Sequence, residues 1–182
     1  MPSARSTAPL AAPTRRTALR LALLPLAAAG LSACGFRLRG QQSFAFTSLF
    51  SGFSDTSDLG EQFVQAMAVA APGVRVITDA AERAQAQVIL DVLEDSRAKT
   101  VATYNASGEA RELTLRSRLR FRLRAPDGDE LIGPSTIEQT RDMSYTESAA
   151  LAKEYEEETL YRDMEADLVQ QLLRRLGALK SL

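Results

Sequence analysis

The feature that most constrains the fold is a two-residue alternation between positions 113 and 124. Leucines and one phenylalanine occupy the odd positions apart from Ser117, and arginines occupy every even position from 116 onward. Successive side chains of a strand point to opposite faces, so this period predicts a strand with one buried and one cationic face. We call the five cations the Arg stripe: Arg116, Arg118, Arg120, Arg122 and Arg124.

Turn-forming residues on both sides of this strand predict antiparallel neighbours. The sequence NASG at 105–108 favours a hairpin, and PDGD at 126–129 favours a second turn. The preceding strand is expected at 88–92, where even positions are apolar, and is expected to continue through 97–103. The following strand is marked by Ile137, Met143 and Tyr145. Two shorter strands are expected at 44–50 and 74–77.

Two segments have the period of a helix. The first begins at Asp58, which forms an N-cap box with Glu61, and ends before Pro72 and Gly73. The second spans about 147–176, has acidic residues early and basic residues late, and could end on Gly177. Its predicted buried stripe is Leu151, Tyr155, Tyr161, Met164, Leu168, Leu172 and Leu176. The predicted fold is α+β, a single antiparallel or mixed sheet with two α-helices packed on one face, in one domain at 44–180.

The first 33 residues have the composition of a signal peptide. Positions 1–20 contain arginines and no acidic residue, and an apolar run of about half the length of a membrane-spanning helix follows at 21–31. Arg15 and Arg16 also resemble a twin-arginine export motif, although an ordinary charged leader has the same composition.

The segment Leu31-Ser32-Ala33-Cys34 resembles the cleavage site of a lipoprotein precursor. Its thiol would take a diacylglyceryl group, and the new amino terminus would then be acylated. Such a doubly modified Cys34 anchors a protein stably, because each buried methylene contributes about 0.8 kcal/mol. Residues 34–43 are then a lipidated N-terminus and tether, and Gly35 in place of Asp favours release to the outer membrane.

The residue inventory argues against several classes of protein. Four of the 22 basic residues and none of the 23 acidic residues precede Cys34, so the mature chain is acidic, and we expect no nucleic-acid partner. One Cys and no His leave few ligands for a metal and few groups for acid–base catalysis. We therefore predict a protein that is not an enzyme, with no catalytic residue, no metal and no cofactor.

The Arg stripe has two interpretations. It is a solvated face neutralised by Asp91, Glu138 and Asp142 on neighbouring strands, or a face that meets an anionic partner, either lipid phosphates or a protein wall. Lys153 also has two interpretations. A cation in the first turn of a helix opposes the helix dipole, so its position needs an explanation. It is balanced by Glu154 and Glu157, or it serves a ligand. The acidic pair Glu156–Glu157 is expected on a solvated helix face.

Both ends of the mature chain resemble one family. The segment at 31–40 reads LSACGFRLRG, and ALAKE at 150–154 is followed by Glu157, Leu160 and Met164. These motifs and the order of elements resemble the LptE family of lipopolysaccharide-assembly lipoproteins over essentially the whole mature chain.

The resemblance implies a lipoprotein on the periplasmic side of the outer membrane. Family members plug and help assemble the β-barrel LptD, and they help to deliver lipopolysaccharide to the cell surface. The sheet would face the lumen wall, and Lys153 would bind lipopolysaccharide. A second basic residue of the family near the hairpin turn aligns with Asn105, so Arg97, Lys99 and Arg111 are the candidates to replace it.

Two other functions remain open on sequence. One is a generic periplasmic lipoprotein that binds another envelope component or a small ligand. The other is a hydrolase that uses two carboxylates converging in a cleft.

Overall fold

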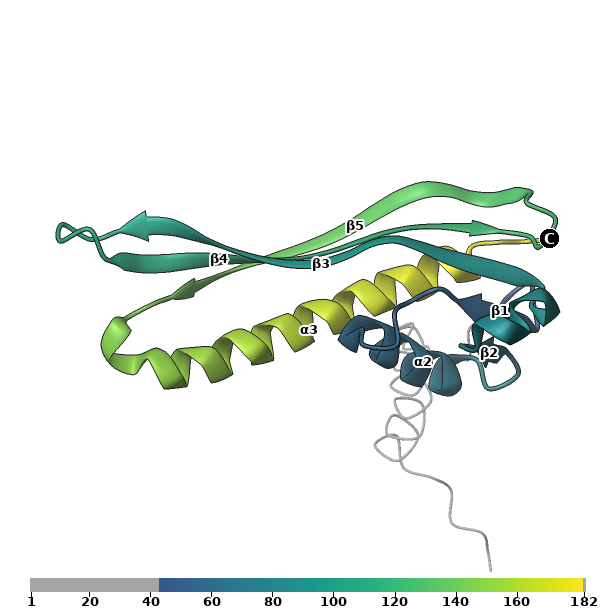
Figure 1. Cartoon of the computed structure of the whole chain (residues 1–182), viewed down its shortest axis with the longest axis horizontal. Coiled ribbons are helices and arrows are strands. Elements are labelled where there is room, and N and C mark those ends of the chain that lie inside the picture. The colour runs from purple at the N-terminus through teal and green to yellow at the C-terminus, as the bar shows by residue number, and fades with distance from the viewer. Residues whose placement is uncertain (1–42, 182) are drawn as a thin grey trace, which may run out of the picture. The chain divides into compact units, whose positions relative to one another are not determined.

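The Leu–Arg alternation forms the middle of the long half of a five-stranded sheet in the computed structural model, which describes residues 43–181 (Figure 1). Its strands are β1 (Ser48–Ser51), β2 (Arg75–Ile77), β3 (Val88–Tyr104), β4 (Ala110–Arg124) and β5 (Glu130–Ser144). The spatial order is β2-β1-β3-β4-β5. β1 is parallel to both of its neighbours, β2 and β3, whereas β3, β4 and β5 are antiparallel to one another in sequence. The expected mixed sheet is confirmed.

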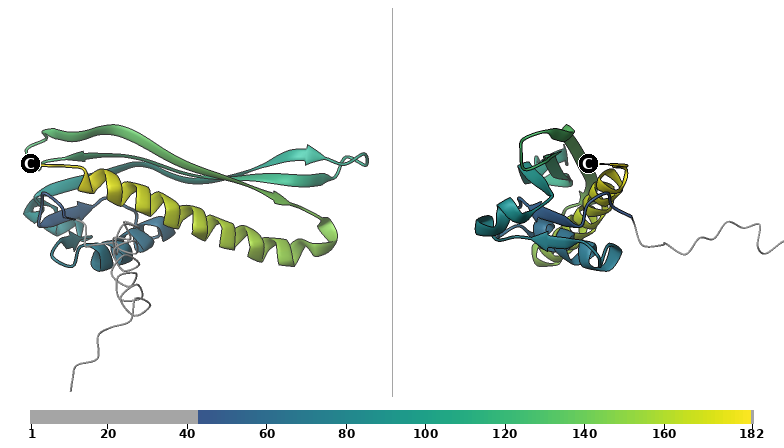
Figure 2. Two further views of the ribbon diagram at one scale, coloured as in Figure 1. Left: turned by 180° about the vertical axis from the view of Figure 1, so that it is seen from behind. Right: turned by 90° about the vertical axis from the view of Figure 1, so that its right-hand side faces the viewer.

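Two α-helices cover one face of the sheet, which we call the inner face (Figures 1 and 2). These are α2 (Asp58–Ala70) and α3 (Ala150–Gly177), and α3 packs against β4, β5 and α2. The expected pair of helices on one face is therefore confirmed. Two short 3₁₀ segments, η1 (Ala80–Gln85) and η2 (Glu147–Ala149), were not expected from the sequence.

The two faces of the sheet differ in chemistry. Leu49, Leu90 and Phe121 point inward to the cluster formed with α2 and α3. On the opposite face, which we call the outer face, η1 caps a small apolar cluster that includes Phe50 and Ile89. This cap covers only the end of the sheet near β1 and β2, because the long half of β3, β4 and β5 extends beyond it (Figure 1).

Two details of the predicted helices are wrong. The first helix is capped by Ser57, whose Oγ accepts a hydrogen bond from the Gly60 N–H at 2.8 Å, and not by Asp58. In α3, Leu151 is 75 % exposed and Tyr155 is 78 % exposed, although both were expected in the buried stripe. Towards its N-terminal end α3 runs away from the sheet, so the apolar period continues past the region where α2 and the sheet cover it (Figure 1).

The turn after β1 depends on Gly52, which gives a first prediction. Its N–H donates to the Leu90 carbonyl at 2.9 Å, and a Cβ atom here would lie 2.4 Å from that oxygen. We expect Gly52→Ala to lower the free energy of unfolding by about 1–3 kcal/mol, because the backbone must move. Urea unfolding of the purified domain measures this. Gly73→Ala is the control, since no atom lies within 4 Å of its added Cβ; equal losses at both sites would contradict the prediction.

Candidate functional site

The outer face carries the Arg stripe as the alternation predicts. The odd residues of β4 from Leu113 to Leu123 are buried, and the even residues from Arg116 to Arg124 are exposed or half-buried. The stripe divides into two parts according to its partners. We call Arg122 and Arg124 the closed end, and Arg116, Arg118 and Arg120 the open part.

At the closed end, three guanidinium groups converge on Asp91 of β3. Its carboxylate accepts from Arg83 at 2.8 Å, from Arg122 at 2.9 Å and from Arg124 at 2.7 Å. Burial alone would raise the pKa of Asp91, but hydrogen bonds from Arg124 and Arg122, together with their charges, outweigh burial and lower it. Asp91 was expected to neutralise the stripe, whereas Arg83 of η1 was not expected here.

This cluster predicts a pH-dependent contribution to stability. The folded pKa of Asp91 is lowered, so its contribution is complete above the unfolded pKa of about 3.9 and is lost as pH falls through the folded value. We expect Asp91→Asn to cost about 1.5–3 kcal/mol at neutral pH and progressively less below about pH 4. Chemical denaturation across pH measures this, with Asp163→Asn on the exposed side of α3 as control. A cost that is independent of pH would contradict it.

In the open part, the contacts are longer. Arg116 and Arg118 each lie 3.5 Å from the Glu138 carboxylate, and Arg118 lies 3.7 Å from Glu94. The Arg120 side chain is exposed and makes no ion pair or hydrogen bond with another residue in 43–181. Glu138 therefore neutralises the stripe as expected. Asp142 does not, because its carboxylate accepts from the Thr114 hydroxyl at 2.6 Å.

A β-bulge in β3 turns two of the predicted ligand-binding cations inward. Val92 pairs with Phe121 and Glu94 pairs with Arg120, so β3 has one extra residue here. The insertion exchanges the residues of β3 that face inward with those that face outward. From this point odd residues face α3. Arg97 and Lys99 thus lie on the inner face, between the sheet and the helices, and not on the face of the Arg stripe.

Arg97 joins three elements. Its Nε donates to Glu165 of α3 at 2.6 Å, and its Nη2 donates to Asp58 of α2 at 2.8 Å. The Glu165 side chain is only 3 % exposed and also accepts from Gln62 at 2.9 Å. The guanidinium lies 5.1 Å from the ring centre of Tyr161. Sequence periodicity did not predict that Glu165 is buried, because an acidic residue in an amphipathic helix is expected on its solvated side.

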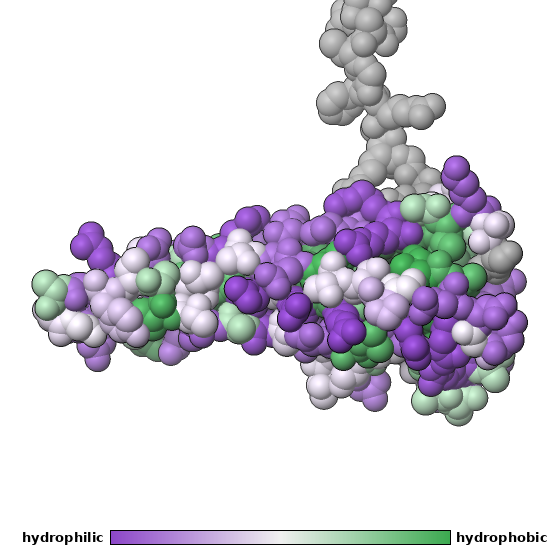
Figure 3. All heavy atoms as spheres, turned by 90° about the horizontal axis from the view of Figure 1, so that it is seen from above, coloured by the Kyte–Doolittle hydropathy of each residue, from purple (hydrophilic) through white to green (hydrophobic). Residues whose placement is uncertain are grey.

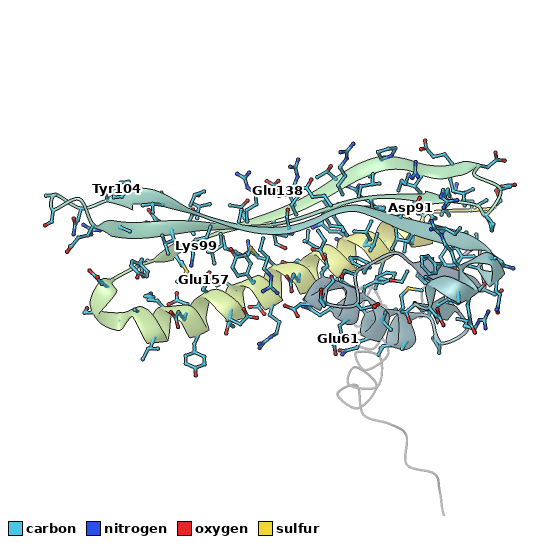
Figure 4. All side chains as sticks on the ribbon, viewed as in Figure 1. Glu61, Asp91, Lys99, Tyr104, Glu138 and Glu157 are labelled. Atoms are coloured by element: carbon cyan, nitrogen blue, oxygen red, sulfur yellow. The ribbon has the colours of Figure 1, made fainter. Side chains whose placement is uncertain are left out.

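Lys99 makes a similar contact farther along β3. Its Nζ donates to Glu157 at 2.8 Å, and the two side chains point towards one another between β3 and α3 (Figure 4). This hydrogen bond is the main cause that raises the pKa of Lys99 above its ordinary value. The interpretation of Glu157 as part of a solvated helix face is therefore wrong.

Lys153 and Arg111 contact two adjacent residues at the far end of β5. The Lys153 Nζ donates to the Ser144 hydroxyl at 3.0 Å and to Glu156 at 2.7 Å, so neither predicted partner balances it. The Arg111 carbonyl accepts from the Tyr145 N–H at 2.8 Å, and its side chain is exposed. Arg111 and Tyr145 line an open hollow of about 920 Å³ whose other walls come from the 105–110 turn and 146–148.

The remaining predictions are of two kinds: some concern residues that the structure does not describe, and others concern sites expected to be absent. Cys34, the signal peptide and most of the tether lie outside residues 43–181. Between Ser43 and Ser181, no group of three or more His, Cys, Asp or Glu is placed to hold a metal ion. No helix in this range combines the length and the apolar character needed to cross a membrane.

Comparison with known proteins identifies the family. Residues 46–176 match the family model LptE, described as lipopolysaccharide-assembly. Lipoprotein B from Nitrosomonas europaea, solved by NMR, is 30 % identical, with 79 % of this chain and 91 % of that chain covered and a TM-score of 0.65. Rare lipoprotein B from Shewanella oneidensis shares the fold at 22 % identity, covering 72 % and 94 % of the two chains with a TM-score of 0.58. No curated protein sequence matches. The chain belongs to the LptE family of lipopolysaccharide-assembly proteins.

Proposed function

We propose that this protein is a non-catalytic outer-membrane lipoprotein, anchored on the periplasmic side through Cys34. It assembles lipopolysaccharide at the cell surface together with a β-barrel of the LptD type, for which it acts as plug and assembly factor. The observation that carries this proposal is the family match over residues 46–176. The long, charged outer face of β3, β4 and β5 supports it, because a plug needs a polar surface against a barrel lumen.

The far end of β5 is the proposed lipopolysaccharide site. Lys153 binds Ser144, and Arg111 lines the hollow beside Tyr145, so this end of β5 carries two cations, which suits the phosphates of an anionic lipid. Large apolar side chains are exposed nearby in the chain, with Tyr104 at 64 % and Leu151 at 75 % exposure. Such a mixture of cations and exposed apolar surface fits a phosphorylated lipid. Lys153 binds Glu156, and Arg97 and Lys99 likewise bind acidic residues of α3, so a phosphate would have to compete with a carboxylate at each of these three cations.

Purification through an affinity tag on the full-length lipoprotein tests the barrel partnership. We expect gently solubilised outer membranes to yield an equimolar complex with one β-barrel protein. Recovery of the lipoprotein alone would count against the proposal and would favour a generic periplasmic lipoprotein. In the same membranes, Cys34→Ser should release the protein to the soluble fraction, because the acyl chains are its anchor.

Titration of the purified protein with lipopolysaccharide tests the lipid site. We expect the double variant Lys153→Glu, Arg111→Glu to bind more weakly, and the remaining difference from wild type to shrink at high salt. Arg162→Glu with Arg174→Glu is the matched control, since both residues are exposed on α3. Equal binding by the two double variants would remove Lys153 and Arg111 from the site.

A further inference from the structure

The parallel strands β1 and β2 end at the same edge of the sheet. From β1 the chain continues to α2 on the inner face, and from β2 it continues to η1 on the outer face. Connections that leave adjacent parallel strands for opposite faces open a crevice at the carboxyl ends of the strands. Sheets of this kind bind their ligands in that crevice.

Two hollows meet at this edge. The first, of about 700 Å³, extends over the outer side to Phe50 and Arg83, and the second, of about 420 Å³, extends to Gly60 and Val64 of α2. We call the two hollows together the edge crevice. Both are lined by the same five residues, which are Ser51, Phe53, Ser54, Asp55 and Thr78. The larger hollow has the volume of a small-molecule site.

Ser51 is the residue of the edge crevice that most needs a partner. It is only 4 % exposed, and its side chain lies on the same side of β1 as that of Leu49, towards α2. Its hydroxyl makes no hydrogen bond with any residue in 43–181. Buried hydroxyl groups are normally hydrogen-bonded, because burial without a partner is unfavourable. A polar ligand in the edge crevice would supply the missing partner.

The charges around the first hollow favour a neutral ligand. Asp91 forms part of its wall and binds three guanidinium groups, including that of Arg83, so this cluster has an excess of two positive charges. The carboxylates of Asp55 and Asp79 line the same hollow and balance this excess. A ligand with a net charge of either sign would therefore meet a like charge.

Hydroxyl groups and one aromatic ring complete the lining. The Thr78 side chain is exposed, and its hydroxyl makes no hydrogen bond within the described part of the chain. A hydroxyl group both donates and accepts, as the hydroxyl groups of a sugar do. The ring of Phe53 adds apolar surface, which suits the C–H groups of a sugar ring. Figure 3 shows hydrophilic and apolar residues side by side at this end of the molecule.

We infer that the edge crevice binds a neutral sugar unit of an oligosaccharide. Ser51 and Thr78 form hydrogen bonds with its hydroxyl groups, and the Asp55 carboxylate accepts from them. The inference is independent of the proposed function, because the lipid site lies at the opposite end of the long strands (Figure 1). Acetamido sugars and plain hexoses share this chemistry, so both are compared in the test.

Titration of the full-length lipoprotein with two trisaccharides tests the inference. The ¹⁵N-labelled protein is held in phosphocholine micelles, which carry no sugar, and tri-N-acetylchitotriose or maltotriose is added to millimolar concentration. We expect at least one of them to shift the amide resonances of Ser51, Asp55 and Thr78 until saturation, with no shift in the turn at 105–108. No shift with either sugar would overturn the inference. Saturation by phosphate or spermidine alone would overturn it as well, because the ligand would then be charged.

The double variant Ser51→Ala, Asp55→Ala tests the contacts. We expect its affinity for the bound trisaccharide to fall about tenfold or more, because hydrogen bonds to the ligand are lost. Ser107→Ala with Asp163→Ala is the matched control, since both residues are exposed elsewhere. Equal affinities of the two double variants would contradict the inference. Thr78→Val, which keeps the shape of an exposed side chain, should also weaken binding, so the result does not depend on a change at a buried position.

Two further measurements complete the test. Thermal unfolding should occur at the same temperature in both double variants, because Ser51→Ala removes a hydroxyl that has no partner in 43–181. Recovery of the barrel partner should equal that of wild type in every variant. A failure of sugar binding therefore leaves the proposed function standing, and a failure to recover any barrel leaves the edge crevice untouched.

Discussion

Replacing Arg97 by Ala is expected to lower the free energy of unfolding by about 3–5 kcal/mol. The reason is the carboxylate that it leaves behind. Glu165 is almost fully buried, and without Arg97 it keeps the hydrogen bond from Gln62 but loses its charged partner. A buried charge without a counterion loses its hydration and has too few hydrogen bonds to replace it. The folded protein must therefore either keep an unpaired carboxylate or protonate it, and both cost free energy. Urea unfolding at neutral pH measures the loss.

A double variant separates this effect from simple loss of packing. Arg97→Met with Glu165→Leu removes both charges and keeps similar volume, so its stability should return close to that of wild type. Arg162→Ala, on the exposed side of α3, should change stability by less than about 0.5 kcal/mol. The account of this pair is wrong if Arg97→Ala resembles that control, or if the double variant is as unstable as the single one.

Replacing Phe121 by Ala is expected to cost about 3–5 kcal/mol, as for other large-to-small changes in a core. The ring is fully buried in the cluster that joins β3, β4 and β5 to α3, and the Arg175 guanidinium lies 5.9 Å from its centre. Truncation leaves a cavity, because the surrounding core residues relax only in part. The midpoint of urea unfolding and the slope of the transition give the value.

The next residue in the chain provides the control for Phe121. Arg120 occupies the opposite face of the same strand, and its side chain makes no ion pair or hydrogen bond in the described range. Arg120→Ala should therefore change stability by no more than about 0.5 kcal/mol. Similar losses at positions 120 and 121 would show that the two faces of β4 are not distinct.

The strongest sequence patterns predicted the corresponding structure correctly. The alternation in β4, the turns at 105–108 and 126–129 and the two helical periods give the long sheet and both α-helices. These predictions succeed because burial of one face imposes a period on the residues themselves. Polar segments carry no such period. Residues 94–104 are mostly polar, so the sequence does not predict the bulge after which odd instead of even residues of β3 face inward. For the same reason it does not predict that Arg97 and Lys99 face inward.

The candidate site was predicted only in part for the same reason. Asp91 and Glu138 lie on neighbouring strands, where cross-strand pairing with the Arg stripe follows from topology. The contact of Glu157 with Lys99 joins residues 58 positions apart, and that of Lys153 with Ser144 joins two elements that meet in an open turn. They depend on how α3 lies across the sheet, which local patterns do not specify. The N-cap error at Ser57 is of another kind, since Asp58 is equally suited to a cap and is used for Arg97 instead.

Photocrosslinking in intact cells tests the docking of this lipoprotein in a barrel most directly. A crosslinking amino acid is placed at position 120 on the outer face and, in a second strain, at position 162 on the exposed side of α3. We predict that position 120 yields one dominant adduct whose attached peptide comes from the lumen wall of an outer-membrane β-barrel. Adducts at position 120 that contain only lipopolysaccharide, or a soluble periplasmic protein, would contradict the account.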